Sequence, residues 1–110
     1  MAGTDLVVIG AGPGGYVAAI RAAQLVMKVV IAEKDACGGT CLNYGCIPTK
    51  ALYKNAQVMG YMDRSREFGI EIDGYRLDME QVQARKNKIV KTLTGGVEYL
   101  LKSNKVAIEK

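Results

Sequence analysis

Two cysteines, Cys41 and Cys46, are the residues of this 110-residue chain best suited to chemistry. The second stands just before Pro48, which is favourable in the first turn of a helix. A thiol at a helix N-terminus has a lowered pKa, because the helix dipole and unpaired N–H groups stabilise its thiolate. A close pair of thiols with one activated sulfur is what reversible dithiol–disulfide exchange requires. We therefore interpret the pair as a redox site.

Other roles for the cysteines fit the sequence less well. Together with Cys37 they give a C-x3-C-x4-C spacing that matches no common zinc pattern, and the chain contains no histidine to complete four ligands. We therefore expect no metal site. A role as inert buried hydrophobes would leave the flanking glycines and Lys50 unexplained. Cys37 itself is interpreted as a small buried hydrophobe.

A glycine-rich segment, Gly10 to Gly15, fits the pattern G-x-G-x-x-G. The pattern is weak alone, but an apolar run at 5–9 predicts a strand before it, buried on both faces. An alanine-rich helix to about Val26 and a second strand at 28–32 are expected after it. In this βαβ context the segment predicts a dinucleotide site. A glycine loop selected only for tight packing is the alternative.

Each part of that pattern has a physical role. Gly10 permits the tight turn, Gly12 lets the backbone approach a pyrophosphate, and Gly15 lets the helix pack closely on the strand. The helix N-terminus supplies N–H donors to the phosphates. Glu33, at the end of the second strand, can accept hydrogen bonds from the ribose hydroxyls.

The rest of the chain is expected to be mainly helical. Residues 37–45 are interpreted as a loop, and a helix is expected from about Gly45–Pro48 to Arg66, with Ala51, Leu52, Ala56, Val58 and Met59 facing inward. Asp78 is a good N-cap for a long second helix, in which Gly95 and Gly96 allow a kink or a close contact. Residues 106–108 are interpreted as a third strand.

The segment from Gly38 to Lys50, G-G-T-C-L-N-Y-G-C-I-P-T-K, closely resembles the active-site signature of the flavoprotein disulfide reductases. Leu42 and Ile47 are more similar to the dihydrolipoamide dehydrogenases than to glutathione or mercuric reductases, which tend to have valine at both places. Residues 14–25 and 84–97 also resemble that type, so the resemblance covers nearly all of the chain. The chain departs from that type at two positions: Val26 stands where its members commonly have glycine, and Cys37 where they have an apolar residue. Tyr44 occupies a position that varies among them.

The resemblance implies FAD in the first dinucleotide site and NAD as a second cofactor bound outside this chain. It implies oxidation of dihydrolipoamide carried on lipoyl domains of 2-oxo acid dehydrogenase or glycine cleavage complexes, with NAD+ as acceptor. A substrate thiolate attacks Cys41, and Cys46 then passes the electron pair to FAD. Lys50, one turn into the helix, stabilises negative charge that develops on the flavin. The residues implied to bind the cofactor are Gly10, Gly12, Pro13, Gly14, Gly15, Glu33, Lys34, Gly39, Thr40, Cys41, Cys46 and Lys50.

Enzymes of this type are homodimers, use a histidine base from the partner subunit and carry a second glycine fingerprint for NAD. Neither a histidine nor a second fingerprint occurs here. We therefore expect residues 1–110 to be a partial FAD-binding domain of α/β, Rossmann-like fold, without the NAD-binding and dimerisation domains. We expect it to be inactive alone and to expose apolar surface and sheet edge. Another flavoprotein disulfide reductase, or a free-standing flavin-binding module, is the alternative.

Composition excludes several other classes. The net charge is +4, and the densest basic stretch, residues 85–91, is interpreted as a solvated helix face rather than a nucleic-acid surface. No apolar run is long enough to span a bilayer, and the N-terminus lacks a signal-type pattern. The expected compartment is the cytoplasm, or the mitochondrial matrix for a processed eukaryotic chain.

Overall fold

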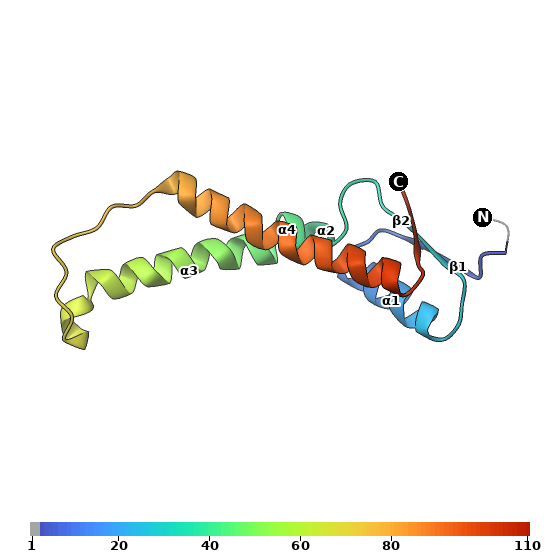
Figure 1. Ribbon diagram of the computed structural model, residues 1–110, viewed down its shortest axis with the longest axis horizontal. Coiled ribbons are helices and arrows are strands. Elements are labelled where there is room, and N and C mark those ends of the chain that lie inside the picture. The colour runs from blue at the N-terminus through green and yellow to red at the C-terminus, as the bar shows by residue number, and fades with distance from the viewer. Residues whose placement is uncertain (1–2) are drawn as a thin grey trace.

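A computed structural model describes residues 3–110, which form a small parallel sheet joined to two long helices (Figure 1). In chain order the elements are β1 (Leu6–Ile9), α1 (Pro13–Gln24), β2 (Val29–Ala32), α2 (Gly39–Asn43), α3 (Cys46–Asp63), a 3-10 turn η1 (Ser65–Phe68), α4 (Met79–Ser103) and β3 (Ala107–Glu109). The strands lie in the order β1-β2-β3, and all pairs are parallel. The expected α/β fold with a βαβ unit and a third parallel strand is therefore confirmed.

The sheet has one covered and one open face. Leu6 and Val8 of β1 pack with Ile31 of β2 against the core that contains alanines of α1. The alternate residues of β1 point the other way, so Val7 is 43% exposed and Ile9 is 90% exposed. The expectation that β1 is buried on both faces was wrong, because among the described residues helices cover only one side of this strand. Only the central strand β2 is buried throughout most of its length.

The C-terminal half of α4 completes the core. Leu101 of α4 and Ile31 of β2 are the largest side chains that are fully buried, and Val97 lies in the same cluster. The chain then turns through Lys105, at φ 63°, directly into Val106 and β3. The end of α4 therefore fixes the third strand on the sheet.

Leu101→Ala is expected to lower the free energy of unfolding by about 3 kcal/mol, because it removes a fully buried side chain and leaves a cavity. The neighbouring Leu100 is 48% exposed, so Leu100→Ala is a matched control with an expected loss below about 1 kcal/mol. Urea unfolding of both variants measures the difference. Equal losses would contradict the role of Leu101 in the core.

The helices α3 and α4 lie side by side for part of their length and project away from the sheet (Figure 1). Asp78 caps α4 as expected, since its Oδ1 accepts a hydrogen bond from the Gln81 N–H at 3.1 Å. Arg85 links the two helices: its Nη1 donates to the Ala51 carbonyl oxygen at 3.1 Å and to Asn55 Oδ1 at 3.3 Å. Helix α4 continues through Gly95 and Gly96, where an added Cβ would meet no atom within 4 Å.

The inward face expected for α3 was mostly wrong. Ala51 is buried and Met59 half-buried, whereas Leu52, Ala56 and Val58 are exposed. The physical reason is that α3 has a helix on one side only, so much of its apolar surface finds no partner among the described residues.

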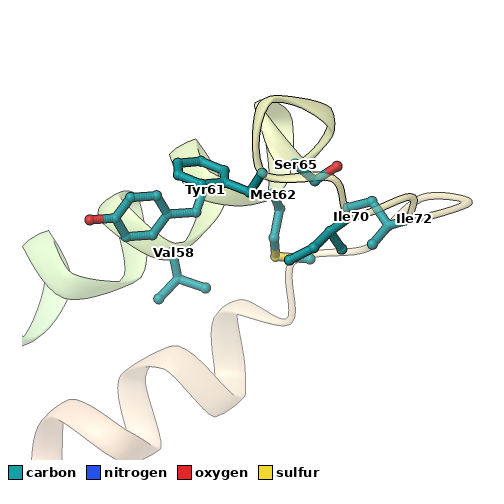
Figure 2. Close-up of a pocket in the computed structure, with 7 residues that line it drawn as sticks. Val58, Tyr61, Met62, Ser65, Ile70 and Ile72 are labelled. Carbon is teal, nitrogen blue, oxygen red and sulfur yellow. The ribbon is translucent and has the colours of Figure 1, made fainter.

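The far end of the helix pair holds an apolar hollow of about 360 Å³ (Figure 2). Val58, Tyr61 and Met62 of α3 line it together with Ile70 and Ile72 of the irregular segment that follows. Residues 70–78 contain no regular secondary structure. None of the residues that line this hollow lines the groove beside the glycine-rich loop.

Candidate redox and nucleotide site

Two glycine-containing loops meet at the carboxyl end of the sheet. The N–H of Gly38 donates to the Ala11 carbonyl oxygen at 2.7 Å. A Cβ placed on Gly39 would lie 2.6 Å from the Cα of Gly12, which is closer than real Cβ atoms approach. The loop before α1 and the start of α2 are therefore in direct backbone contact, and Gly39 cannot carry a side chain without moving the loop before α1.

A groove of about 550 Å³ runs along this contact. Its lining includes eight of the residues expected to bind the cofactor: Gly10, Gly12, Pro13, Glu33, Lys34, Gly39, Thr40 and Cys41. Gly14, Gly15, Cys46 and Lys50 lie outside this lining. Four further residues of the lining were missed in the sequence: Asp35, Ala36, Asn43 and Tyr44. Asn43 and Tyr44 lie within the cysteine signature, whereas Asp35 and Ala36 lie between Glu33 and that signature in the chain.

Glu33 joins the end of β2 to the glycine-rich loop. Its Oε2 accepts a hydrogen bond from the Ala11 N–H at 2.8 Å, and its Oε1 accepts one from the Asp35 N–H at 2.9 Å. These two bonds hold the pKa of the Glu33 carboxyl below its ordinary value, with the Ala11 bond contributing most. The carboxylate therefore shapes the loop that borders the groove, and its outer lone pairs remain available to a ligand hydroxyl.

The lowered pKa of Glu33 predicts a dependence of stability on pH. A carboxyl whose pKa is lower in the folded chain than in the unfolded chain adds stability above its unfolded pKa. That stability is lost as the pH falls through its folded pKa. Glu33→Gln removes this contribution, so the difference in Tm between wild type and variant is expected to shrink as the pH falls below about 4.3. Thermal unfolding at a series of pH values measures it. If the difference in Tm did not depend on pH, the conclusion that the backbone N–H groups bond to the ionised Glu33 carboxylate would be contradicted.

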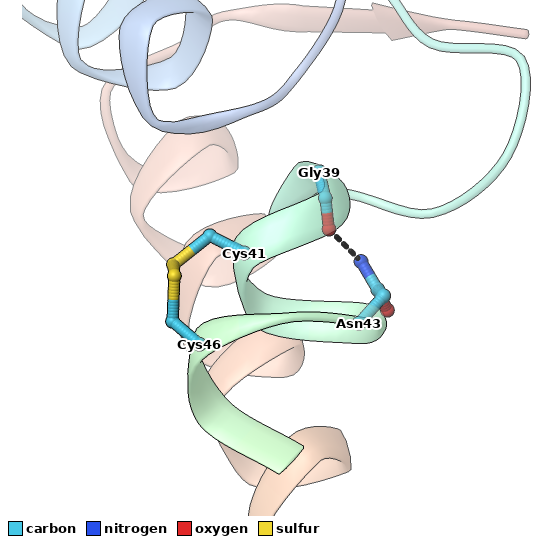
Figure 3. Close-up of a disulfide and its surroundings, with 4 residues drawn as sticks. All are labelled: Gly39, Cys41, Asn43 and Cys46. Carbon is cyan, nitrogen blue, oxygen red and sulfur yellow. Dashed lines mark hydrogen bonds between the residues drawn. A yellow bond between two sulfur atoms is a disulfide. The ribbon is translucent and has the colours of Figure 1, made fainter. Parts of the chain in front are cut away.

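Cys41 and Cys46 form a disulfide, with their Cα atoms 4.6 Å apart (Figure 3). Cys41 is half-buried in α2, and Cys46 is the exposed first residue of α3. The position of Cys46 at a helix N-terminus agrees with the sequence expectation. The expectation that residues 37–45 form only a loop was wrong, because 39–43 make the short helix α2.

Asn43 explains how this glycine-rich stretch becomes helical. Its Nδ2 donates to the carbonyl oxygen of Gly39 at 2.9 Å, as Figure 3 shows, and to that of Cys37 at 3.2 Å. Gly38 enters the helix at φ 106°, a conformation that other residues rarely adopt. The side-chain amide therefore stabilises a turn whose composition alone favours a loop.

The third cysteine, Cys37, is free and 3% exposed. Burial raises the pKa of its thiol, and the charges of Glu98 and Glu33 act in the same direction. The expectation of a buried hydrophobe is confirmed.

In the folded protein, Cys37 is expected to react with iodoacetamide at least about tenfold more slowly than it does after unfolding, since the thiolate is the nucleophile. Quantitative mass spectrometry of labelled peptides tests this; equal rates would contradict the burial.

Lys50 lies one turn after Cys46 on α3 and is exposed. Residues four apart share a face of a helix, so the lysine and the exposed cysteine lie on the same side of α3. The spacing allows a positive charge to act near the disulfide.

A second, apolar hollow of about 510 Å³ lies beside the cysteine pair. Leu42 and Ile47, each next to a cysteine in the chain, line it together with Leu93 and Val97 of α4 and Tyr16 of α1. Polar atoms contribute almost nothing to this surface. Cys41 thus lines the polar groove, while a chain neighbour of each cysteine lines the apolar hollow.

The model of the family described as "Pyridine nucleotide-disulphide oxidoreductase" matches residues 4–110. The chain belongs to the pyridine nucleotide-disulphide oxidoreductase family. The glycine-rich loop, Cys41 and Cys46 all lie within the matched residues, and the resemblance drawn from the cysteine segment is confirmed.

The sequence is also similar to curated dihydrolipoyl dehydrogenases. It is 55% identical to the dihydrolipoyl dehydrogenase of Geobacillus stearothermophilus over 107 aligned residues, which make up 97% of this chain and 23% of the relative. It is 49% identical over 106 residues to that of Chlamydia pneumoniae, covering 96% and 23%. It is 56% identical over 104 residues to that of Haloferax volcanii, covering 94% and 22%. The chain thus spans about a quarter of the length of the relatives that it matches.

Within residues 3–110, none of the helices combines the length and the apolar character needed to cross a membrane. No group of three or more His, Cys, Asp or Glu side chains in this same part of the chain could hold a metal ion.

Proposed function

We propose that this chain supplies the FAD-binding and disulfide-bearing part of an enzyme that oxidises dihydrolipoamide with NAD+ as acceptor. The observation that carries the proposal is that Cys41 of the Cys41–Cys46 disulfide lines the groove, while Leu42 and Ile47, the chain neighbours of the two cysteines, line the apolar hollow. The match to dihydrolipoyl dehydrogenases over nearly the whole chain supports the same activity.

The groove fits a dinucleotide in its chemistry. Its floor is the contact between Gly12 and Gly39, where backbone can approach a diphosphate closely, and α1 begins at its edge with Pro13. The Glu33 carboxylate offers acceptors for ribose hydroxyls. We propose that Gly10, Gly12, Pro13, Gly14, Gly15, Glu33, Lys34, Gly39, Thr40, Cys41, Cys46 and Lys50 bind FAD. When bound, FAD accepts an electron pair from the reduced cysteines and passes it on to NAD+.

The cysteines carry out the exchange with the substrate. A thiolate of dihydrolipoamide attacks Cys41, the S–S bond breaks, and Cys46 leaves as a thiolate that the N-terminus of α3 stabilises. The second substrate thiol then attacks the mixed disulfide, which releases cyclic lipoamide and leaves two reduced cysteines. Lys50 supplies a positive charge on the Cys46 face of α3, which stabilises negative charge developing there.

The apolar hollow favours a lipoyl substrate over a peptide disulfide. The dithiolane ring and its aliphatic chain are apolar, and the walls formed by Leu42, Ile47 and Leu93 match them. Glutathione carries charged groups that these walls could not pair. The corresponding macromolecular partners are lipoyl domains of 2-oxo acid dehydrogenase or glycine cleavage complexes. The enzyme that binds them is a homodimer.

Turnover requires groups that the 110 residues do not contain. The sequence has no histidine to act as a general base and no second glycine fingerprint for NAD. We propose that residues 1–110 act as a partial FAD-binding domain, and that a histidine and an NAD site from other parts of the enzyme complete the site.

A visible absorption spectrum of the full-length protein tests the proposal. Addition of dihydrolipoamide without oxygen is expected to give a long-wavelength charge-transfer shoulder on the flavin bands, because a cysteine thiolate then faces the flavin. Cys46→Ser should retain flavin but give no shoulder. A protein that binds no flavin, or one that is reduced by glutathione and not by dihydrolipoamide, would contradict the proposal.

A further inference from the structure

Tyr44 lies inside the loop that the Cys41–Cys46 disulfide closes, and it is bonded to a different part of the fold. Its hydroxyl donates a hydrogen bond to Asp35 Oδ2 at 2.7 Å. Asp35 is itself held at two backbone atoms: its N–H donates to Glu33 Oε1 at 2.9 Å, and its carbonyl oxygen accepts from Lys110 Nζ at 2.8 Å. The phenol therefore connects the redox loop to the segment that follows β2.

The other hydrogen bonds of this loop are local. The Tyr44 N–H donates to the Thr40 carbonyl oxygen at 2.8 Å, and the Asn43 amide donates to the carbonyl oxygens of Gly39 and Cys37. These bonds order α2 but do not attach residues 44 and 45, between α2 and α3, to the sheet. The bond from Tyr44 to Asp35 provides that attachment, and both side chains border the groove.

We propose that Tyr44 is a positioning residue for the redox pair. Its bond to Asp35 holds the loop between the cysteines in the shape that the closed disulfide requires. Closing the disulfide removes conformational entropy from this loop. If the bond from Tyr44 to Asp35 already restrains the loop in the dithiol form, less entropy is lost when the disulfide forms. By linkage, a bond that forms better in the disulfide state shifts the equilibrium toward the disulfide. This inference rests on the proposed function, in which the pair cycles between disulfide and dithiol.

The protonation of Tyr44 is consistent with this role. The hydrogen bond to the Asp35 carboxylate raises the pKa of the phenol, since the ionised acceptor favours the protonated donor. The phenol therefore stays a donor at neutral pH, where the exchange takes place.

The reaction that measures the effect is reduction of the pair by a vicinal dithiol. Dihydrolipoamide gives up two electrons and two protons and closes to a cyclic disulfide. The electron pair breaks the Cys41–Cys46 bond; Cys41 takes up one proton, Cys46 stays a thiolate, and the second proton goes to solvent. Loss of the phenol hydroxyl removes one hydrogen bond that favours the disulfide, so it should make the pair easier to reduce by about two- to fivefold.

The test is a thiol–disulfide titration of the full-length protein in a Cys37→Ala background. This background is needed because the tryptic peptide 35–50 contains all three cysteines. The protein is equilibrated with mixtures of dihydrolipoamide and lipoamide, quenched by alkylation, and its reduced fraction measured by mass spectrometry. The variants are Tyr44→Phe, which removes only the hydroxyl, and Asp35→Ala, which removes the acceptor but keeps both backbone bonds. Tyr53→Phe, at an exposed tyrosine of α3, is the matched control.

Both single variants are expected to shift the equilibrium two- to fivefold toward the dithiol, the double variant no further, and the control not at all. A purely structural role would instead lower the stability of disulfide and dithiol forms equally and leave the equilibrium unchanged, which would overturn the inference. Additive shifts in the double variant would also overturn it, because the two residues would then act separately. If the pair in the Cys37→Ala parent fails to titrate reversibly, the proposed function itself is wrong.

Discussion

Gly15→Ala is expected to destabilise the chain by about 4 kcal/mol or more and to abolish binding of a dinucleotide. A Cβ at this position would overlap the carbonyl oxygen of Gly10 and would lie 3.4 Å from Val8 Cγ1. The overlapping atom belongs to the backbone of the turn between β1 and α1, so no side-chain rotation can relieve the overlap. Helix α1 would have to move away from the sheet, and Ala19 and Ala22 of the core would move with it.

Gly14→Ala is the matched control, since it changes the adjacent residue of the same helix. Its Cβ would meet no atom within 4 Å, and alanine has the higher helix propensity. We expect Gly14→Ala to leave the free energy of unfolding unchanged or to raise it by up to about 1 kcal/mol. Urea unfolding of the two variants provides the comparison. If the Gly15 variant were as stable as the Gly14 variant, the close packing of α1 on the turn would be disproved.

Cys46→Ser is expected to reduce the oxidation of dihydrolipoamide by the full-length enzyme by roughly three orders of magnitude or more. Serine has nearly the same size and can occupy the first position of α3, but its oxygen cannot form or break the bond to Cys41. The loss should therefore appear in kcat, with the folded structure retained. Steady-state rates with dihydrolipoamide and NAD+ measure it.

Cys37→Ala is the control for this experiment, because it also removes a sulfur from the same peptide. Cys37 is buried in the core and is not bonded to either partner of the disulfide. Its replacement should keep the rate within about twofold. A Cys46→Ser enzyme that retained a substantial part of the wild-type rate would show that the disulfide is not the route of the electrons.

Much of the fold could be predicted because several local signals agree with each other. Apolar runs, the glycine pattern and Asp78 as a cap predicted the order of strands and helices, and each corresponds to a short-range physical cause. The cysteine pair could be predicted for the same reason, since its chemistry depends on Cys46 at a helix start, which Pro48 marks.

The remaining features depend on contacts between distant residues. Helix α2 forms because the Asn43 amide reaches two carbonyl groups, although glycine-rich composition favours a loop. The pairing of Tyr44 with Asp35 joins two segments whose proximity only the fold reveals. The exposed apolar residues of α3 and β1 lie on faces that no other described element covers. Hydrophobic periodicity identifies the apolar face of an element, but it does not show whether another element packs against that face.

The projecting pair α3 and α4 has a hydrodynamic consequence. The chain measures 66 × 24 × 18 Å, and its radius of gyration is 19.6 Å, against about 13 Å for a globular domain of this length. As an isolated monomer it would tumble anisotropically, much faster about its long axis than end over end. The N–H vectors of both helices point roughly along that axis (Figure 1). In ¹⁵N relaxation their transverse rates would exceed those of amides pointing across it, so no single correlation time describes the molecule.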